Sequence, residues 1–223
     1  MKRLFEVCTG NLASVIAAVE GGAERIELCS ALSLDGLTPS IGLLKYVRQT
    51  FPELKIHVLI RSCEGGFVYS KDDLDTMLLD IHEASSYADG IVCGALTQEG
   101  DIDTEALRLM VETSEGKPFT FHRAFDKCRN PQEALEQIID AGCKRILTSG
   151  QQPTAEQGIP LLHELNKQAN GRIIIMPGGG VNGKNARLIL YQTGCIEIHG
   201  SCSSGSGVTS AERVQQVKAI IGG

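Results

Sequence analysis

Short runs of β-branched and apolar residues alternate along the chain with longer segments in which apolar residues recur at helical spacing. The predicted strands span residues 4–8, 25–29, 55–61, 90–93, 118–122, 144–148, 172–176 and 195–199. The predicted helices span residues 11–21, 40–50, 71–87, 103–114, 131–141, 154–169, 182–192 and 209–220. Strands that alternate with helices in this way indicate β-α units and a parallel sheet.

Residues that favour helix ends support these boundaries. Thr38 and Asn130 each precede a proline, so we expect their side chains to cap the second and fifth helices. Glycines follow the first, fifth and seventh helices at positions 21–22, 142 and 194. Glycine is common there because it adopts the left-handed conformation that ends a helix.

The repeat of eight β-α units predicts an α/β fold, a single (β/α)8 TIM barrel that occupies residues 1–223 as one domain. Right-handed crossovers between the strands are the default. A doubly wound open sheet is the alternative. We disfavour it because no Gly-x-Gly-x-x-Gly turn follows the first strand and because the strand count reaches the number that closes a barrel.

Composition excludes several classes of partner. The 223 residues are 42% hydrophobic and 22% charged, which is typical of a globular protein with a sizeable core. Lys and Arg total 21 against 27 Asp and Glu, so a net charge of −6 argues against nucleic acid and membrane surfaces. The start of the chain is too polar for a signal peptide, and no run approaches a membrane span. We therefore expect a cytoplasmic protein.

Alternation within the strands predicts apolar side chains toward the helices and polar side chains toward the barrel axis. The inward set comprises Glu6, Cys8, Glu27, Cys29, His57, Arg61, Thr120, His122, Glu197 and His199. Barrel interiors are normally filled by Val, Ile and Leu, so these polar groups must pair with one another or with a ligand.

Two interpretations of this interior remain open. The first is a structural ion-pair network in which the carboxylates of Glu6, Glu27 and Glu197 face Arg61 and Arg123. The second is a functional site at the carboxyl ends of the strands, where barrel enzymes place their chemistry. We favour the second, since Cys8, Cys29, Arg61, His122 and His199 all fall at those ends.

Three loops after the late strands are rich in glycine and hydroxyl groups. They are Thr148-Ser149-Gly150, Pro177-Gly178-Gly179-Gly180 and His199-Gly200-Ser201. Exposed N–H groups in such loops can hold an anion, and many barrels bind phosphate after their seventh and eighth strands. Tight turns are the alternative role for these glycines.

The eight cysteines do not indicate a disulfide framework, because the chain is long and holds no C-x-x-C pair. No zinc signature follows from their spacing. We expect free thiols, with Cys93, Cys128, Cys143 and Cys195 acting as small buried apolar residues.

Motifs spread over nearly the whole chain resemble the copper homeostasis protein CutC family. They include Glu6-Val-Cys8, the stretch Gly21-Gly-Ala-Glu-Arg-Ile-Glu-Leu-Cys-Ser30, Gly36-Leu-Thr-Pro-Ser40, Thr120-Phe-His-Arg-Ala-Phe-Asp126, Leu147-Thr-Ser-Gly150 and Met176-Pro-Gly-Gly-Gly180. The resemblance implies a TIM barrel, a cytoplasmic location, a homo-oligomer and a role in copper handling. The family pattern Arg-Pro-Arg-Gly-Gly-Asp-Phe reads Arg61-Ser-Cys-Glu-Gly-Gly-Phe67 here, so one basic and one acidic residue are missing.

Copper binding also has a chemical basis in the sequence, since thiolates select Cu(I) and two can bind it in a near-linear arrangement. Cys8 and Cys29 occupy equivalent positions at the ends of neighbouring strands, where their sulfurs can share one ion. His199 or Cys202 is a more distant third candidate. Oxidation can join the two cysteines in a disulfide if their Cα separation permits it.

An enzyme is the alternative hypothesis. Carboxylates at Glu6 and Glu27 with Arg61, His122 and His199 resemble the catalytic groups of lyases and isomerases that act on small phosphorylated compounds. No lysine ends a strand at the mouth, so proton transfer through His122 is the expected chemistry. On this hypothesis the mouth binds a small anionic metabolite, held by the arginines and the glycine-rich loops.

Overall fold

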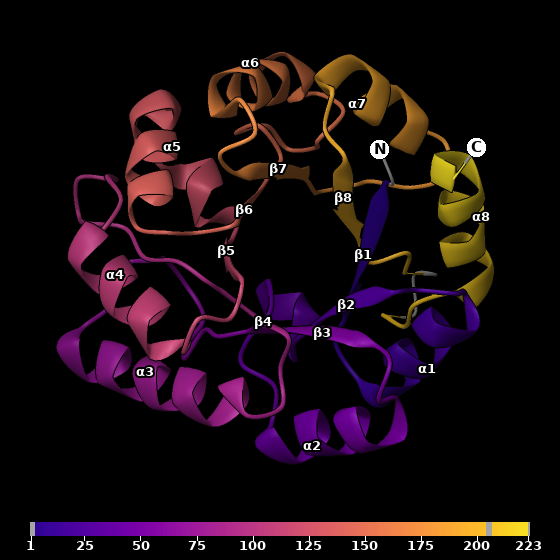
Figure 1. The fold of residues 1–223 in the computed structure, drawn as a ribbon, viewed down its shortest axis with the longest axis horizontal. Coiled ribbons are helices and arrows are strands. Elements are labelled where there is room, and N and C mark those ends of the chain that lie inside the picture. The colour runs from indigo at the N-terminus through magenta and orange to yellow at the C-terminus, as the bar shows by residue number, and fades with distance from the viewer. Residues whose placement is uncertain (1–2, 204–206, 223) are drawn as a thin grey trace.

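The computed structural model describes residues 3–203 and 207–222 and shows a ring of strands surrounded by helices (Figure 1). The strands are β1 (Leu4–Thr9), β2 (Arg25–Leu28), β3 (Lys55–Leu59), β4 (Gly90–Cys93), β5 (Phe119–Phe121), β6 (Arg145–Thr148), β7 (Ile174–Pro177) and β8 (Glu197–Gly200). The helices are α1 (Leu12–Glu20), α2 (Ile41–Thr50), α3 (Lys71–Ser85), α4 (Thr104–Thr113), α5 (Pro131–Asp140), α6 (Ile159–Ala169), α7 (Ala186–Thr193) and α8 (Ala211–Gly222). Short 3-10 helices at Leu32–Leu34 and Arg123–Lys127 follow β2 and β5.

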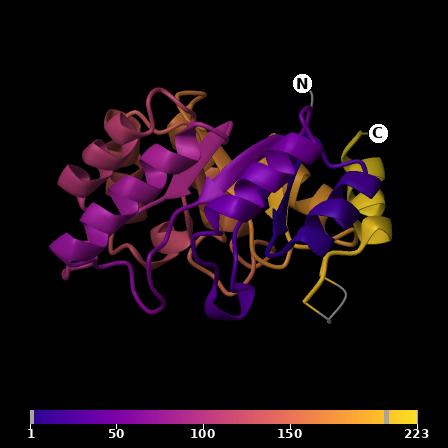
Figure 2. The same cartoon turned by 90° about the horizontal axis from the view of Figure 1, so that it is seen from below.

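The strands form one parallel sheet in the order β7-β6-β5-β4-β3-β2-β1-β8. Its end strands, β7 and β8, lie side by side and bring the sheet round to a nearly closed barrel (Figure 1). This arrangement confirms the predicted TIM barrel and excludes the open sheet. In Figure 2, β1 begins and α8 ends at the upper end of the barrel. The loops that follow the strands therefore gather at the opposite end, which we call the mouth.

The main apolar core lies between the strands and the ring of helices, as the alternation predicted. Val7 and Ile26 point outward and are fully buried in the same cluster as Val15 of α1 and Val47 of α2. Burial of such side chains contributes about 25 cal/mol for each Å² of apolar surface removed from water. Within the described part of the chain, no helix has the length and apolar character that a membrane span requires.

Helix caps agree with the sequence at most predicted positions. Asn130 accepts a hydrogen bond from the Glu133 amide, and Pro131 occupies the first turn of α5, as expected. Gly194 ends α7 in the left-handed conformation with a φ of 72°. The expected cap at Thr38 is wrong: Ser40 caps α2 instead, and the Thr38 hydroxyl is used to accept a hydrogen bond from the Arg61 amide.

Helices α6 and α7 begin later than predicted, because polar residues in the preceding loops form local turns. The Asn182 side chain accepts a hydrogen bond from the Lys184 amide, and the Asn182 amide donates to Asn185. Such side-chain bonds compete with the first helical turn. Before α6, Gly158 packs so closely against the Ser149 carbonyl that a side chain would not fit there.

Candidate functional site

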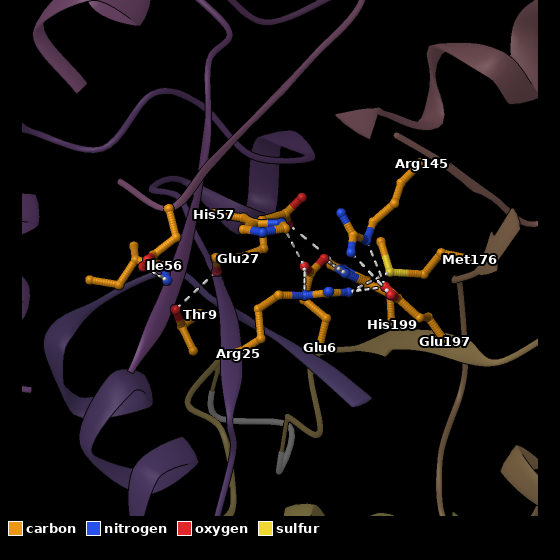
Figure 3. A network of polar contacts seen from close by, with 11 residues as sticks. Glu6, Thr9, Arg25, Glu27, Ile56, His57, Arg145, Met176, Glu197 and His199 are labelled. Carbon is orange, nitrogen blue, oxygen red and sulfur yellow. Dashed lines mark hydrogen bonds and ion pairs between the residues drawn. The ribbon is translucent and has the colours of Figure 1, made fainter. Parts of the chain in front are cut away.

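Arg25 lies inside the barrel between two carboxylates (Figure 3). Its Nε atom is 2.6 Å from Glu6 Oε2, and its Nη2 atom pairs with Glu197. Arg145 approaches Glu197 from β6, with Nε 2.7 Å from Glu197 Oε2. Because an isolated buried charge is costly, this alternation of cations and anions is what allows charged groups in the interior.

The cations of this network differ from those expected. The ion-pair interpretation of the interior named Arg61 and Arg123 as its cations, but these residues lie beyond the ends of β3 and β5 and make other contacts. Arg61 donates to backbone carbonyls, and Arg123 pairs with Asp126 at 2.7 Å. Arg25 and Arg145 are the first residues of their strands, and the pleat turns both inward.

Glu6 connects the network to two histidines. Its Oε2 atom is 3.1 Å from His57 Nδ1, and its Oε1 atom is 3.0 Å from His199 Nδ1 (Figure 3). Burial opposes ionisation of Glu6, but the Arg25 charge and the hydrogen bonds of both histidines outweigh it and hold the pKa well below its usual range. Glu6 is therefore a buried carboxylate that positions the His199 ring.

The far side of the His199 ring faces Glu27, with 3.6 Å between His199 Nε2 and Glu27 Oε2. Burial opposes a charge on His199, yet the Glu27 charge and the hydrogen bonds of Cys8 and Glu6 raise its pKa well above the ordinary value. Burial raises the pKa of Glu27, and the His199 charge only partly offsets this effect. Protonated His199 is thus held between two carboxyl groups.

The thiols of Cys8 and Cys29 are in contact, with their Sγ atoms 3.9 Å apart. They lie with Leu59 and Val92 in a small apolar cluster inside the barrel, separate from the main core. The contact with Cys29 and burial together raise the pKa of the Cys8 thiol well above its ordinary value. Both cysteines are free thiols, as predicted, and so are the other six.

The two cysteines are not at equivalent positions of the sheet, which corrects the expectation from the sequence. The parallel ladder pairs Cys8 with Glu27, and Cys29 follows two residues later, beyond the end of β2. The sulfurs meet because both side chains turn toward the barrel axis. The same register brings Glu27 beside Cys8, so a carboxylate, a thiol and the His199 imidazole converge. Their ligand atoms lie within 4.8 Å of one another.

The loop at Thr148-Ser149-Gly150 holds an anion, but that anion belongs to the protein. The Asp126 carboxylate accepts hydrogen bonds from the Thr148 hydroxyl, from the Ser149 amide at 2.9 Å and from the Gln151 amide at 3.2 Å. The Gly150 amide donates to the Thr148 hydroxyl. These donors are already used within the protein, so the prediction that this loop contacts a ligand is not supported by the geometry.

The glycines after β7 have two different roles. Gly178 packs against its neighbours, since a Cβ there would lie 2.5 Å from Leu147 Cδ1 and 3.3 Å from His199 Cβ. Gly179 and Gly180 have positive φ angles of 100° and 73° and face the mouth. Ser201, after β8, also faces it. The loops after the last two strands therefore supply part of the wall that we expected.

A cavity of about 800 Å³ occupies the mouth, a volume that suits a small molecule. The predicted site residues that line it are Cys8, Glu27, Cys29, Arg61, His122, Gly179, Gly180, His199 and Ser201. Glu6 does not line the cavity but holds His199, which does. The sequence had indicated neither Arg25 nor Arg145 nor Asp126 as part of this region. Strand alternation could have identified both arginines, because each precedes an outward apolar residue.

Comparisons with known proteins show the family to which the chain belongs. The CutC family profile matches residues 3–204. A Bacteroides fragilis protein named as a family protein CutC is 53% identical over 197 residues, 88% of this chain and 78% of its own length. A human copper homeostasis protein cutC homolog is 45% identical over 202 residues, 90% of this chain and 74% of its own.

A solved structure extends the likeness to three dimensions. The crystal structure of a candidate copper homeostasis protein CutC from Streptococcus agalactiae superposes with a TM-score of 0.85 at 34% identity. The match covers 89% of this chain and 98% of that one. Sequence motifs, a profile that spans the barrel and relatives at this level of identity all lead to the same assignment, and the chain therefore belongs to the CutC family.

Proposed function

We propose that the protein binds one Cu(I) ion between the sulfurs of Cys8 and Cys29, within the copper homeostasis role of its family. The observation that supports this most directly is the contact between two buried free thiols at the wall of an open cavity. Soft sulfur ligands favour Cu(I) over the harder divalent ions that carboxylates attract. Leu59 and Val92 give the pair an apolar surrounding on its buried side.

The separation of the sulfurs sets the geometry of the ion. With metal–sulfur bonds of about 2.3 Å, two sulfurs 3.9 Å apart subtend roughly 115° at a shared metal, whereas a linear arrangement needs about 4.6 Å. The near-linear site expected from the sequence would therefore require the cysteines to move apart. A trigonal site fits them as they stand and leaves a place for a third ligand.

His199 supplies that ligand in the proposal, which requires its ring and the Cys29 sulfur to move closer, because His199 converges with Cys8 and Glu27 but not with Cys29. Its Nε2 atom faces Cys8 and Glu27, while its Nδ1 atom is held by Glu6. A histidine whose other ring nitrogen bonds a carboxylate is the usual arrangement of an imidazole that binds a metal. Imidazole is also a better ligand than carboxylate for Cu(I), so Glu27 is a neighbour of the ion and does not bind it.

The enzyme hypothesis receives less support. Burial and the nearby Arg61 charge lower the pKa of His122 to about 3, far from the value that suits proton transfer near pH 7. The relatives named above carry names that refer to CutC or copper homeostasis. We therefore treat His122 as a hydrogen-bond donor and propose no reaction for it.

Titration of reduced protein with Cu(I) against a chromophoric chelator tests the site. Wild type should bind one ion, and Cys8→Ser and Cys29→Ser should each weaken binding by 100-fold or more. His199→Asn should weaken it by at least the roughly 10- to 100-fold that follows loss of a residue supporting a ligand, because His199 is itself a ligand in the proposal. X-ray absorption should show two sulfur neighbours and one nitrogen, with the nitrogen absent in His199→Asn.

Cys63→Ser and Cys202→Ser are the matched controls. Cys63 is exposed on the loop after β3, and Cys202 is buried in the main core. Both variants should bind like wild type. Equal affinity in Cys8→Ser, Cys29→Ser and wild type would show that the thiol pair is not the site. Two sulfur neighbours with no nitrogen would retain the pair but exclude His199.

A further inference from the structure

A second part of the mouth holds hydrogen-bond donors that have no acceptor. Arg61 is 3% exposed, and its guanidinium donates to the carbonyls of Leu34 at 2.9 Å, Gly36 at 3.1 Å and Gly65 at 2.7 Å. Its Nε atom is buried and has no partner. In the described parts of the chain, no carboxylate lies within ion-pair distance of Arg61. Its positive charge therefore meets neutral groups: carbonyl dipoles, the Tyr69 hydroxyl and the ring of Phe67.

His122 is the second such donor. Its Nδ1 atom accepts a hydrogen bond from the Ala124 amide at 3.3 Å, so the ring proton belongs on Nε2. Burial and the Arg61 charge keep the ring neutral at physiological pH. The Nε2–H group is buried and has no acceptor. A buried donor without a partner is destabilising, and such groups commonly mark a site that a ligand or water completes.

Phe67 links the two donors. The Arg61 guanidinium lies 5.1 Å from the centre of the Phe67 ring, and the His122 ring meets the same ring edge-on with centroids 4.9 Å apart. All three side chains line the mouth cavity. Phe67 follows Gly65 and Gly66, where a Cβ would touch nothing within 4 Å. Through its ring contacts, Phe67 packs against both donors at the wall of the cavity.

From these contacts we infer that the cavity wall at Arg61 and His122 binds the oxyanion of a small organic anion, a carboxylate or a phosphate. Two N–H donors with no acceptor between them match a group that only accepts hydrogen bonds. The uncompensated guanidinium charge favours an anion over a neutral carbonyl or hydroxyl.

The cavity also has hydrogen-bond donors and a cation on another wall, at Gly179, Gly180 and Arg123, which can contact a second group of the ligand. The amides of Gly179 and Gly180 have no partner in the described structure, and Arg123 lies beside Gly179, 3.6 Å from where its Cβ would be. This wall can hold a second negative group. The inferred site shares the cavity with the thiol pair but uses none of the residues proposed to bind copper.

The test uses copper-free protein, with inorganic phosphate, citrate and glycerol 3-phosphate as probes and glycerol as the neutral comparison. Melting temperatures should rise with probe concentration, because a ligand that binds only the folded state stabilises it by mass action. We expect at least one anion to act at millimolar concentration and glycerol to have no effect. A larger shift with citrate would identify a carboxylate as the preferred group, and a larger shift with phosphate or glycerol 3-phosphate would identify a phosphate.

Arg61→Met should abolish the shift, while Arg129→Met should keep it, because Arg129 is exposed and pairs with Asp101 away from the cavity. If Arg61→Met fails to fold, ¹⁵N NMR of histidine-labelled wild type decides instead. The His122 Nε2 resonance should carry a proton and move when the effective probe is added. No response to any anion, an equal response in Arg61→Met or an unmoved His122 resonance would each overturn the inference.

Repeating the titration on Cys8→Ser separates the two proposals. An unchanged response to the anion shows that its site is independent of the thiol pair. Each proposal can then be refuted without the other: the protein can bind the anion without binding Cu(I), or bind Cu(I) without binding the anion.

Discussion

The Nδ1 atom of His199 lies 3.0 Å from Oε1 of Glu6 because β8 and β1 pair in the register that sets these two residues opposite each other. The carboxylate fixes the ring and leaves Nε2 on the side of Glu27 and Cys8. A single pairing between the last strand and the first thus connects the buried ion-pair network to the mouth. The contact forms only when the first and last strands pair, since the two residues are 193 positions apart in the sequence.

Glu6 should be essential for stability. Its side chain is fully buried and is one of two carboxylates that pair with Arg25, so Glu6→Gln leaves Arg25 and Arg145 to share the single charge of Glu197 in the interior. We expect a loss of about 3–5 kcal/mol in the free energy of unfolding, the range for one broken half of a buried pair. Urea denaturation measures it. Glu136→Gln is the control, because it breaks an exposed ion pair with Arg172. The hypothesis fails if both variants show the same small change.

Copper affinity should rise with pH. In the copper-free protein, the contact with Cys29 and burial raise the pKa of Cys8, and the carboxylates hold the pKa of His199 well above its ordinary value. Both groups therefore keep their protons at neutral pH, and Cu(I) must displace them together with the proton of the free Cys29 thiol. Release of three protons makes affinity increase by about 1000-fold per pH unit. Chelator titrations at pH 6, 7 and 8, corrected for the chelator, check this. Affinity that does not change with pH would contradict it.

Glu27→Gln should tighten copper binding. The Glu27 charge stabilises protonated His199, and it repels the negative cluster that two thiolates form with Cu(I). Removing the charge should increase affinity at pH 7 by roughly tenfold, equivalent to one pKa unit of interaction. Glu64→Gln is the control, since Glu64 is exposed on the loop after β3. Weaker binding in Glu27→Gln would instead identify Glu27 as a ligand.

Two glycines with ordinary φ angles should respond differently to alanine. Gly178→Ala places a Cβ 2.5 Å from Leu147 and 3.3 Å from His199, so we expect overpacking to cost about 1–3 kcal/mol. Gly66→Ala meets nothing within 4 Å and should be neutral or slightly stabilising. Thermal unfolding of both variants measures the difference. Equal melting temperatures would show that the β7 loop can relax around the added methyl group.

The sequence by itself determined the barrel. Periodic apolar residues fix which segments become strands and helices, and alternation within a strand fixes which side faces the axis. This local information placed Glu6, Glu27, Glu197 and His199 in the interior before any contact was known. It also identified the two cysteines at the mouth, because the carboxyl end of a strand can be read from its length.

Only the tertiary structure decided which of these groups meet. Register between strands distant in sequence pairs Cys8 with Glu27 and Glu6 with His199, and no local pattern encodes it. The conformation of the loop after β6 directs its hydrogen-bond donors at the Asp126 carboxylate. Arg61 Nε and His122 Nε2, by contrast, have no acceptor. Hydrophobic period specifies the direction of a side chain relative to its own strand. The partner that it reaches depends on the stagger of the closed barrel, which all eight strands set together.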